Sequence, residues 1–443
     1  MATMPILRAA FASALVLALT AAPSAGADDR DGYRSDRDGF HSDRDDGFHR
    51  DRHGKHDRDR HERDHEILSI DHAVPHISTV PANEGEEVVL FVRERVLAED
   101  DTVLKKVGFD ERRHRRDRGS DIVLFVHGGT VSSVPDFDLR YEDYNWAEYL
   151  ARHGFDVFMM DQSGYGFSPR PEMDDPCNVN PDDQELLVPN PLSEPCDPSY
   201  PFNLTTRQSD WDEIDSVVDY IRELRRADRI HLAGWSAGVP RVAGYAALHP
   251  EKVAKLYLYA GSVGDTESLD PPDEVPAPGF PMNLQTHDEL MHGRWDSEVG
   301  CEDQFDPDIR PVVWNTIMSF DPLGSTWGSP PWNPVASPEG GVMRTRTATS
   351  WGWNIETAAM VEAPSLHIVG EFDAPDRRRL LYDVIGSKHK VFIEVACASH
   401  FLVWERQHDI LLETSKEWFS RGTVDGEREG TFWVDELGRI HEQ

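Results

Sequence analysis

Short apolar runs alternate with amphipathic segments along the chain from Ile67 onward. The apolar runs fall at residues 87–92, 121–126, 155–160, 229–233, 253–259, 365–369 and 390–395, and the amphipathic segments at 145–152, 209–226, 239–248, 376–385 and 407–419. Nearly continuous apolar runs of this length are typical of parallel strands that are covered on both faces. The alternation therefore predicts an α/β fold, with a mostly parallel, doubly wound sheet and helices on both faces.

The amphipathic segment 209–226 carries its apolar residues on one stripe, as a helix that packs on a sheet should. Ser209 or Asp210 is its expected N-cap, since short polar side chains satisfy the free N–H groups of a first helical turn. Near the C-terminus, residues 431–434 and 439–441 predict a small hairpin.

One interval, about 262–362, breaks the alternation. It is rich in Pro, Gly, Asp and Trp, has no clean strand pattern, and is too long for an ordinary loop. We expect a cap inserted after the sixth strand. Its tryptophans either line an apolar pocket or form the core of the cap itself: Trp295, Trp314, Trp327, Trp332, Trp351 and Trp353.

The N-terminal region predicts an exported protein. Residues 1–27 combine a short apolar run with Ala25-Gly26-Ala27, a pattern typical of a cleaved signal peptide. Residues 28–66 are rich in Asp, Arg, His and Gly, and should be disordered because they have almost no apolar side chains. This tract is either a solvated tail or a metal-binding one. One domain, 67–443, should follow in a secreted or periplasmic protein without a stable membrane anchor after signal removal.

The net charge indicates which partners the chain binds poorly, and the cysteines indicate the compartment in which it resides. The chain has 45 basic and 81 acidic residues, a net charge of −36, so nucleic acid and anionic membranes are poor partners. Four cysteines in an exported chain predict disulfides. Cys177 and Cys196 flank a Pro-rich and Asp-rich loop, 172–201, and should pair. Cys301 and Cys397 either form a second bridge or remain thiols.

Ser236 is the candidate nucleophile. It lies in Gly234-Trp235-Ser236-Ala237-Gly238, a G-x-S-x-G run between the strand 229–233 and the helix 239–248. A strand-to-helix elbow needs small neighbours, because it holds its serine on a tight and strained turn. The N-terminus of the following helix also favours negative charge beside the serine. The alternative is a purely structural turn.

His400 and Asp373 are the candidate base and its orienting acid. Asp373 follows the strand 365–369 and His400 follows the strand 390–395, so both should lie near Ser236 at the carboxyl edge of the sheet. Asp265, after the strand 253–259, is an alternative acid, and Glu371 is a weaker one. His400 could instead be an ordinary exposed histidine.

A glycine-rich turn supplies candidate donors for an oxyanion. His127-Gly128-Gly129-Thr130 follows the strand 121–126. The expected oxyanion hole combines a backbone N–H of Gly129 or Thr130 with that of Ala237, the residue after the candidate nucleophile.

The chain resembles the α/β-hydrolase superfamily across about residues 88–419. The features that carry the resemblance are, in chain order, the glycine turn, the run Asp161-x-x-Gly164-x-Gly166-x-Ser168, the elbow, Asp373 and His400. The run that begins at Asp161 is similar to the turn after strand four in the epoxide-hydrolase, haloperoxidase and proline-iminopeptidase branch. Those proteins carry a mostly helical cap after strand six. Epoxide hydrolases and haloalkane dehalogenases have Asp at the elbow, so Ser236 argues against both chemistries.

The residues and the resemblance together predict a serine hydrolase that cleaves a carboxylic ester, in a small molecule or a polymer, through an acyl-enzyme. Ser236, His400 and Asp373 would need no metal or organic cofactor for this reaction. Amide, lactone or thioester hydrolysis and cofactor-free perhydrolysis use the same residues. A non-catalytic binding protein of the same fold is the alternative from another class.

Overall fold

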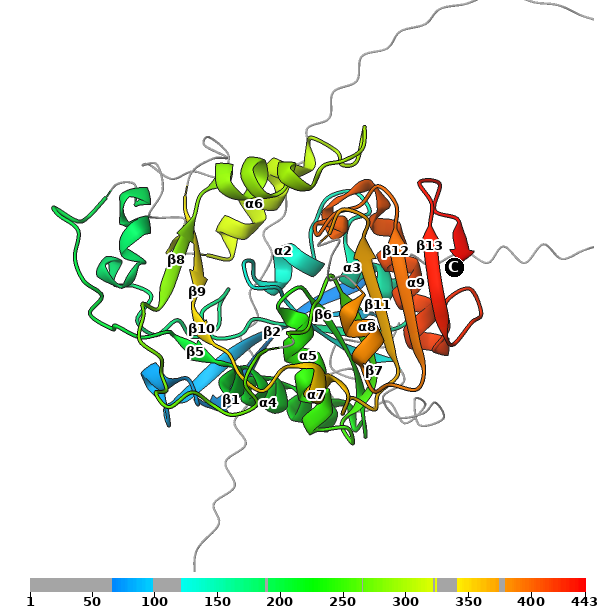
Figure 1. The fold of residues 1–443 in the computed structure, drawn as a ribbon, viewed down its shortest axis with the longest axis horizontal. Coiled ribbons are helices and arrows are strands. Elements are labelled where there is room, and N and C mark those ends of the chain that lie inside the picture. The colour runs from blue at the N-terminus through cyan, green and yellow to red at the C-terminus, as the bar shows by residue number, and fades with distance from the viewer. Residues whose placement is uncertain are drawn as a thin grey trace, which may run out of the picture. The chain divides into compact units, whose positions relative to one another are not determined.

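A ten-stranded sheet dominates the computed structural model, which describes residues 66–98, 121–187, 190–264, 266–321, 323–324, 341–373 and 379–443. The strand order is β1-β2-β4-β3-β6-β7-β11-β12-β13-β14 (Figure 1). The strands are β1 (Ile67–Ile77), β2 (Glu87–Leu97), β3 (Ile122–Val126), β4 (Asp156–Met160), β6 (Ile230–Trp235), β7 (Val253–Tyr259), β11 (Ser365–Gly370), β12 (Lys390–Val395), β13 (Gly430–Val434) and β14 (Ile440–Glu442). From β4 to β13 all neighbours pair in parallel, and antiparallel pairs occur only at the two edges. The predicted α/β fold is confirmed.

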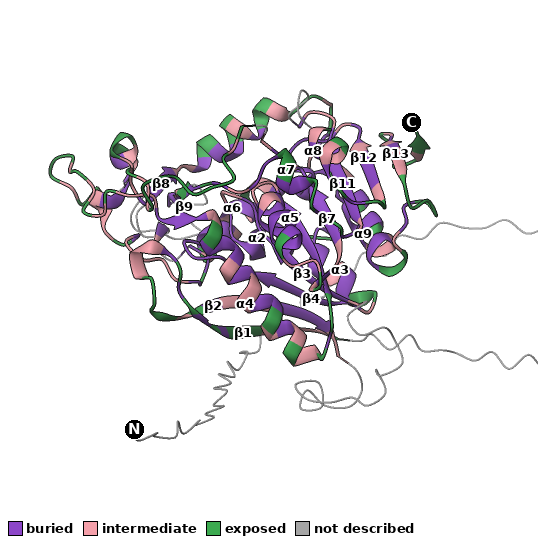
Figure 2. Ribbon diagram, turned by 60° about the horizontal axis from the view of Figure 1, so that its bottom comes forward, coloured by how far each residue is buried: buried purple, intermediate pink, exposed green. Residues whose placement is uncertain are grey.

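Helices cover both faces of the sheet, and each face has its own apolar core. Val123 and Phe125 of β3 belong to a core with α3 and α9, whereas Leu124 belongs to a second core with α4, α5 and α8. The helices are α2 (Ser133–Phe137), α3 (Trp146–Arg152), α4 (Arg207–Arg225), α5 (Gly238–Leu248), α7 (Ile355–Ala358), α8 (Leu380–Val384) and α9 (Asp409–Arg421), with the short turns η1 (Pro81–Asn83), η8 (Leu402–Trp404) and η9 (Arg406–His408). Figure 2 shows the central strands buried throughout. Successive residues of a central strand therefore face opposite cores, which explains why the central runs are continuously apolar.

The start of α4 differs from the expectation. Its N-cap is Thr206, whose side chain accepts a hydrogen bond from the Ser209 backbone N–H. In return, the Ser209 hydroxyl oxygen accepts a hydrogen bond from the Thr206 backbone N–H. Ser209 and Asp210 therefore lie inside the first turn, and their assignment as caps was wrong. The reason is tertiary, because the short strand β5 (Thr205–Thr206) runs directly into the helix while Asp210 is buried against arginines.

The interval between β7 and β11 contains short strands, which the sequence did not reveal. It comprises β8 (Met282–Gln285), η5 (Glu289–Arg294), η6 (Asp296–Glu298), α6 (Ile309–Ser319), β9 (Met343–Arg346) and β10 (Ala348–Thr349). Strands β8 and β9 pair antiparallel, and β10 pairs with β5. The expectation of no clean strand was therefore wrong. Strand β9 has only four residues, and two of them are arginines that pair with Asp321 and Asp210, so its sequence has no apolar pattern.

The loop 172–201 packs against this interval. Its turns η3 (Pro176–Asn178) and η4 (Pro181–Leu186) bring Val179 and Leu187 into a small apolar cluster with Met282 and Leu284 of β8. We call the described parts of 172–206 and 262–362 together the cap. Two segments that are far apart in sequence therefore build it.

The described cap tryptophans form core. Trp295, Trp314, Trp351 and Trp353 are each 9% exposed or less. Trp295 packs on Phe401 with ring centroids 5.4 Å apart. Trp327 and Trp332 lie outside the described residues.

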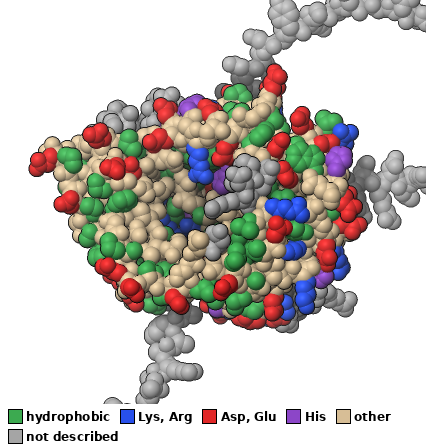
Figure 3. Space-filling view, viewed as in Figure 1, with side chains coloured by type: hydrophobic (Ala, Val, Ile, Leu, Met, Phe, Trp, Pro, Cys, Tyr) green, Lys and Arg blue, Asp and Glu red, His purple; other side chains and the backbone are tan. Residues whose placement is uncertain are grey.

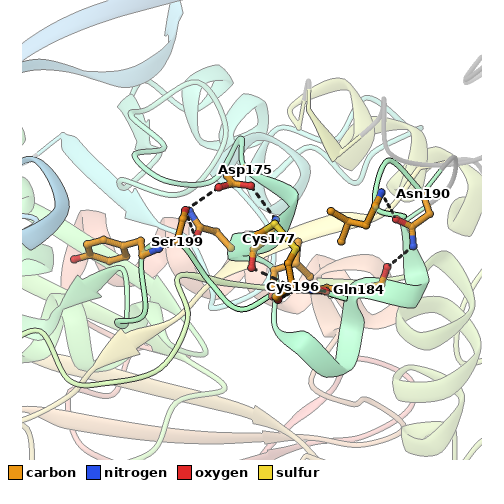
Figure 4. Close-up of a disulfide and its surroundings, with 10 residues drawn as sticks. Asp175, Cys177, Gln184, Asn190, Cys196 and Ser199 are labelled. Atoms are coloured by element: carbon orange, nitrogen blue, oxygen red, sulfur yellow. Dashed lines mark hydrogen bonds between the residues drawn. A yellow bond between two sulfur atoms is a disulfide. The ribbon is translucent and has the colours of Figure 1, made fainter. Parts of the chain in front are cut away.

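Two disulfides are present. Cys177 is joined to Cys196 as predicted, and Gln184 pairs with both backbone groups of Cys196 inside the closed loop (Figure 4). The second bridge, left open by the sequence, joins Cys301 of the cap to Cys397, which lies in the loop after β12. The cap is thus covalently attached to the loop that carries His400.

The predicted C-terminal hairpin is present as β13 and β14. The predicted signal peptide, 1–27, and all but the last residue of the polar tract 28–66 lie outside the described residues. Within the described part of the chain, no helix combines the length and apolar character that crossing a bilayer requires.

Candidate active site

Ser236 lies on a strained turn between β6 and α5. Its φ of 54° is in the left-handed region, which a non-glycine residue adopts only when the surroundings hold it there. A Cβ on Gly234 would lie 2.6 Å from the Gly238 carbonyl oxygen, and one on Gly238 would lie 2.3 Å from the Val126 carbonyl oxygen. Both glycines are therefore required by close backbone approach, as expected of an elbow that presents its serine.

Ser236 and His400 line one cavity at the carboxyl end of the sheet. The cavity has an empty volume of about 280 Å³, counted with the part that opens to solvent. The remaining lining comes from the glycine turn, α2, the elbow, η5 and the loop after β12: Gly128, Gly129, Thr130, Val131, Asp136, Trp235, Leu290, Arg294, Phe401 and Trp404. Apolar and aromatic side chains predominate, so polar groups in this cavity act in a poorly solvated setting.

His400 meets Asp373 on the side away from the cavity. His400 Nδ1 lies 3.0 Å from Asp373 Oδ1, and the two residues are only 9% and 7% exposed. This bond leaves Nε2 as the free ring nitrogen. The described hydrogen bonds include none between Ser236 and His400, and in ligand-free sites such contacts often form only when substrate binds.

One alternative acid, Glu371, contacts the backbone of the loop after β12. Glu371 accepts a hydrogen bond from the backbone N–H of Cys397 at 2.9 Å, so it supports the loop that carries His400. Asp265 lies outside the described residues.

Three side chains fix the backbone of His400. Trp235 Nε1 and the Tyr259 hydroxyl donate to the His400 carbonyl oxygen at 3.1 and 2.7 Å. On the other side, the His400 N–H donates to a Glu298 carboxylate oxygen at 2.8 Å. The elbow, strand β7 and the cap therefore all position the same histidine.

Glu405 ties the cap to the same loop. It is fully buried, and its carboxylate accepts hydrogen bonds from Ser399, from Gln304 at 2.9 Å and from Trp295 Nε1 at 3.2 Å. Burial raises the pKa of Glu405, while these donors oppose the rise. The cap residues 295–304 and the loop 397–405 thus form one hydrogen-bonded unit, which Cys301–Cys397 closes covalently.

The glycine turn lies directly against the elbow. A Cβ on Gly129 would lie 3.3 Å from the Ala237 Cβ, and one on Gly128 would lie 3.5 Å from the Ser236 Cβ. Arg241 of α5 donates to the carbonyl oxygens of His127 and Gly128, at 3.0 Å each. The turn is held by its carbonyl groups. Gly129 therefore lies against Ala237, and Gly129 and Thr130 line the same cavity as Ser236.

His127 braces this turn as a neutral imidazole. The Gln162 N–H donates to His127 Nε2 at 3.2 Å, so the ring proton lies on Nδ1, which donates to the Gly128 carbonyl oxygen at 2.8 Å. Burial, followed by the positive charge of Arg241, lowers the pKa of His127 well below its ordinary value. His127 therefore adds rigidity without adding charge.

The run that begins at Asp161 supports the turn from behind. The buried Asp161 carboxylate accepts from the Ser133 N–H and hydroxyl at 2.9 and 2.6 Å, and the Tyr165 hydroxyl donates to the Gly129 carbonyl oxygen. A Cβ on Gly166 would lie 1.6 Å from an Asp161 carboxylate oxygen, so this glycine is obligatory.

Asp136 is the acidic side chain of the cavity lining. It accepts from the Gly128 N–H at 3.3 Å, and its Oδ1 has no hydrogen-bond partner among the described residues. Burial, with a smaller contribution from the negative charge of Asp161, raises the pKa of Asp136 well above its ordinary value.

Two groups of described residues have metal-ligand spacing, namely His287 with Asp288 and His292, and Asp143 with His408 and Asp409. Neither group belongs to the cavity lining.

Sequence reasoning missed the residues that hold the site together: Trp235, Arg241, Tyr259, Glu298 and Glu405. Trp235 was visible as the variable residue of the elbow. The other contacts join segments that are far apart in sequence and left no local signal.

Comparison with known proteins agrees with this geometry. Residues 121–290 match the family model of the alpha/beta hydrolase fold. No curated protein matches the sequence significantly.

Several solved structures resemble the chain at low identity. A serine hydrolase involved in carbazole degradation is 13% identical, covers 80% of this chain and 99% of its own, and has a TM-score of 0.44. A putative lipase from Sulfolobus solfataricus is 15% identical, with coverages of 81% and 95% and a TM-score of 0.45. A monoacylglycerol lipase from Paleococcus ferrophilus is 17% identical, with coverages of 69% and 96% and a TM-score of 0.41. Likenesses of this strength carry no argument about substrate.

The family match spans the glycine turn, the elbow and the first residues of the cap. The sheet order, the parallel pairing and the strained serine between β6 and α5 extend the agreement through the fold. The chain has the α/β-hydrolase fold, and its residues 121–290 match the model of that family.

Proposed function

We propose that this protein is a serine hydrolase that cleaves a carboxylic ester through an acyl-enzyme, with Ser236, His400 and Asp373 as its triad. The observation that supports this most is the shared cavity: the strained Ser236 and the Asp373-bound His400 both line it, beside the glycine turn.

In the proposed reaction, Ser236 Oγ attacks the ester carbonyl carbon while His400 Nε2 accepts the hydroxyl proton. Asp373 stabilises the imidazolium through its bond to Nδ1. The carbonyl oxygen becomes an oxyanion, which accepts from the backbone N–H of Ala237 and of Gly129 or Thr130. His400 then protonates the leaving alcohol as the carbon–oxygen bond breaks. Water, activated by His400, cleaves the acyl-enzyme and restores Ser236.

The proposal includes export to a secreted or periplasmic location. Disulfides persist in oxidising compartments, and Cys177–Cys196 and Cys301–Cys397 are compatible with such a location. Cleavage after Ala27 would be detected by N-terminal sequencing of the exported protein.

A fluorophosphonate probe tests the nucleophile. The wild-type protein should be labelled on the peptide that contains Ser236, and Ser236→Ala should lose both labelling and hydrolysis of para-nitrophenyl butyrate. Ser420→Ala, which alters an exposed serine of α9 outside the cavity lining, is the control and should keep the label. A wild-type protein that is folded, unlabelled and inactive on every ester would contradict the proposal and favour a binding protein.

A further inference from the structure

Arg294 introduces a positive charge into the cavity. It is the only Lys or Arg among the described lining residues, and η5 of the cap carries it. Its Nη1 approaches the Thr130 hydroxyl at 3.4 Å, and its guanidinium carbon lies 5.3 Å from the centre of the Phe401 ring. The guanidinium therefore lies beside the glycine turn, within the space that a substrate would occupy.

No carboxylate of the described residues neutralises Arg294. The nearest acids along the chain have other partners, since Asp296 pairs with Arg310 and Glu298 accepts from the His400 N–H. No carboxylate oxygen of the described residues lies within 4.0 Å of a guanidinium nitrogen of Arg294, the limit for an ion pair. The guanidinium is half-buried, so water solvates it only in part.

Among the described residues, every fully buried arginine has an acidic partner, whereas the half-buried Arg294 and Arg207 have none within ion-pair distance. Arg344 pairs with Asp321, and Arg346 pairs with Asp210. With a net charge of −36, acidic side chains are abundant, and Figure 3 shows them around the outline of one face, with basic side chains near its hollowed centre. A half-buried arginine without an acid, in a cavity that contains Ser236, is suited to an anionic ligand.

We infer that the substrate carries a carboxylate close to its scissile ester, and that Arg294 binds this carboxylate. The inference rests on the proposed function. A guanidinium presents parallel N–H donors that match a carboxylate in a bidentate manner, and the contact is stronger where aromatic walls exclude water. Phe401 and Trp404 provide such walls.

Asp136, the acidic side chain of the cavity lining, does not pair with Arg294. Asp136 is buried beneath the glycine turn, where it accepts from the Gly128 N–H. Its described hydrogen bond joins it to the backbone of the turn and not to Arg294, and burial raises its pKa well above the ordinary value.

Two matched pairs of esters test the inference. Para-nitrophenyl butyrate is compared with para-nitrophenyl hemisuccinate, which adds a carboxylate to the acyl group, and phenyl acetate with meta-carboxyphenyl acetate, which adds it to the alcohol. For one pair, the wild-type protein should prefer the anionic ester. Arg294→Gln should lower that preference, measured as the ratio of kcat/KM values, by about 10- to 100-fold, and Arg294→Lys by less. The loss should appear mainly as a higher KM.

Arg310→Gln is the control. Arg310 carries the same charge in the same cap but pairs with Asp296 outside the cavity lining, so this variant should alter both esters of a pair equally. If Arg294→Gln also lowers both esters equally, Arg294 acts on the oxyanion or on the fold, and the inference is overturned. Fluorophosphonate labelling separates the two proposals, because a labelled enzyme without anionic preference refutes only the carboxylate, whereas an unlabelled one refutes the hydrolase.

Discussion

The two disulfides allow the effect of the cap on catalysis to be separated from its effect on stability. Cys301→Ser/Cys397→Ser removes the bridge beside His400, and Cys177→Ser/Cys196→Ser removes one that is remote from it. The bridges close loops of different length, with sequence separations of 96 and 19. Loop-closure entropy then predicts losses of about 5 and about 3 kcal/mol in the free energy of unfolding. For a folded unit of Glu62–Gln443, these correspond to falls of about 6 and about 4 °C in Tm.

Activity should distinguish the two variants far more than stability does. Cys397 lies three residues before His400, and Cys301 lies three residues after Glu298, whose carboxylate accepts the His400 N–H. A loosened loop would displace the imidazole, and a shift of about 1 Å can cost about 10²-fold in rate. We expect kcat/KM on para-nitrophenyl butyrate to fall about 10- to 100-fold in Cys301→Ser/Cys397→Ser.

The remote variant Cys177→Ser/Cys196→Ser should stay within a few-fold of the wild type in kcat/KM. Thermal unfolding followed by circular dichroism, with activity measured well below Tm, provides both quantities. Equal activity in the two double variants, whatever their Tm, would show that the link between cap and loop does not position the histidine.

Three further substitutions test individual contacts. Asp373→Asn should lower kcat by about 10⁴-fold, because the imidazole loses its orienting charge, while Asp265→Asn should remain active; the reverse result would identify Asp265 as the acid. Gly238→Ala should abolish activity and lower Tm, since its Cβ would lie 2.3 Å from a β3 carbonyl oxygen, whereas Gly264→Ala meets only a 3.6 Å contact and should be tolerated. Burial raises the pKa of Glu213 from 4.5 to about 7, so its ionisation should weaken the folded state increasingly as the pH rises through this range. Glu213→Gln should therefore gain stability relative to the wild type at about pH 8 but not at about pH 4, as urea unfolding can show; a pH-independent difference would refute this assignment.

The sheet was predictable because its strands carry a local signal. Strands β3 and β4 are buried on both faces and read as nearly continuous apolar runs. Strand β1 was not recognised, because it forms an edge of the sheet and includes His72 and Pro75, residues that an edge tolerates. The cap strands were missed for a related reason, since four residues such as Met343–Arg346 give too short a pattern to detect.

The candidate site was predictable to the extent that its residues follow strands. Ser236, Asp373 and His400 each come directly after a strand of the parallel sheet, so topology alone brings them to one edge. The contact between Glu298 and the His400 N–H depends on how the cap folds back, and no spacing in the sequence encodes it. Arg294 likewise reaches the cavity only through the cap.

Trapping of the acyl-enzyme tests the proposed chemistry most directly. The protein is mixed with para-nitrophenyl acetate, quenched in acid within its first turnovers, digested and analysed by mass spectrometry. We expect one acetyl group on the peptide that contains Ser236, accompanied by a stoichiometric burst of nitrophenol, and neither signal in Ser236→Ala. An active enzyme that releases nitrophenol without acetylation of Ser236, or that acetylates a different residue, would contradict the assignment of Ser236 as the nucleophile.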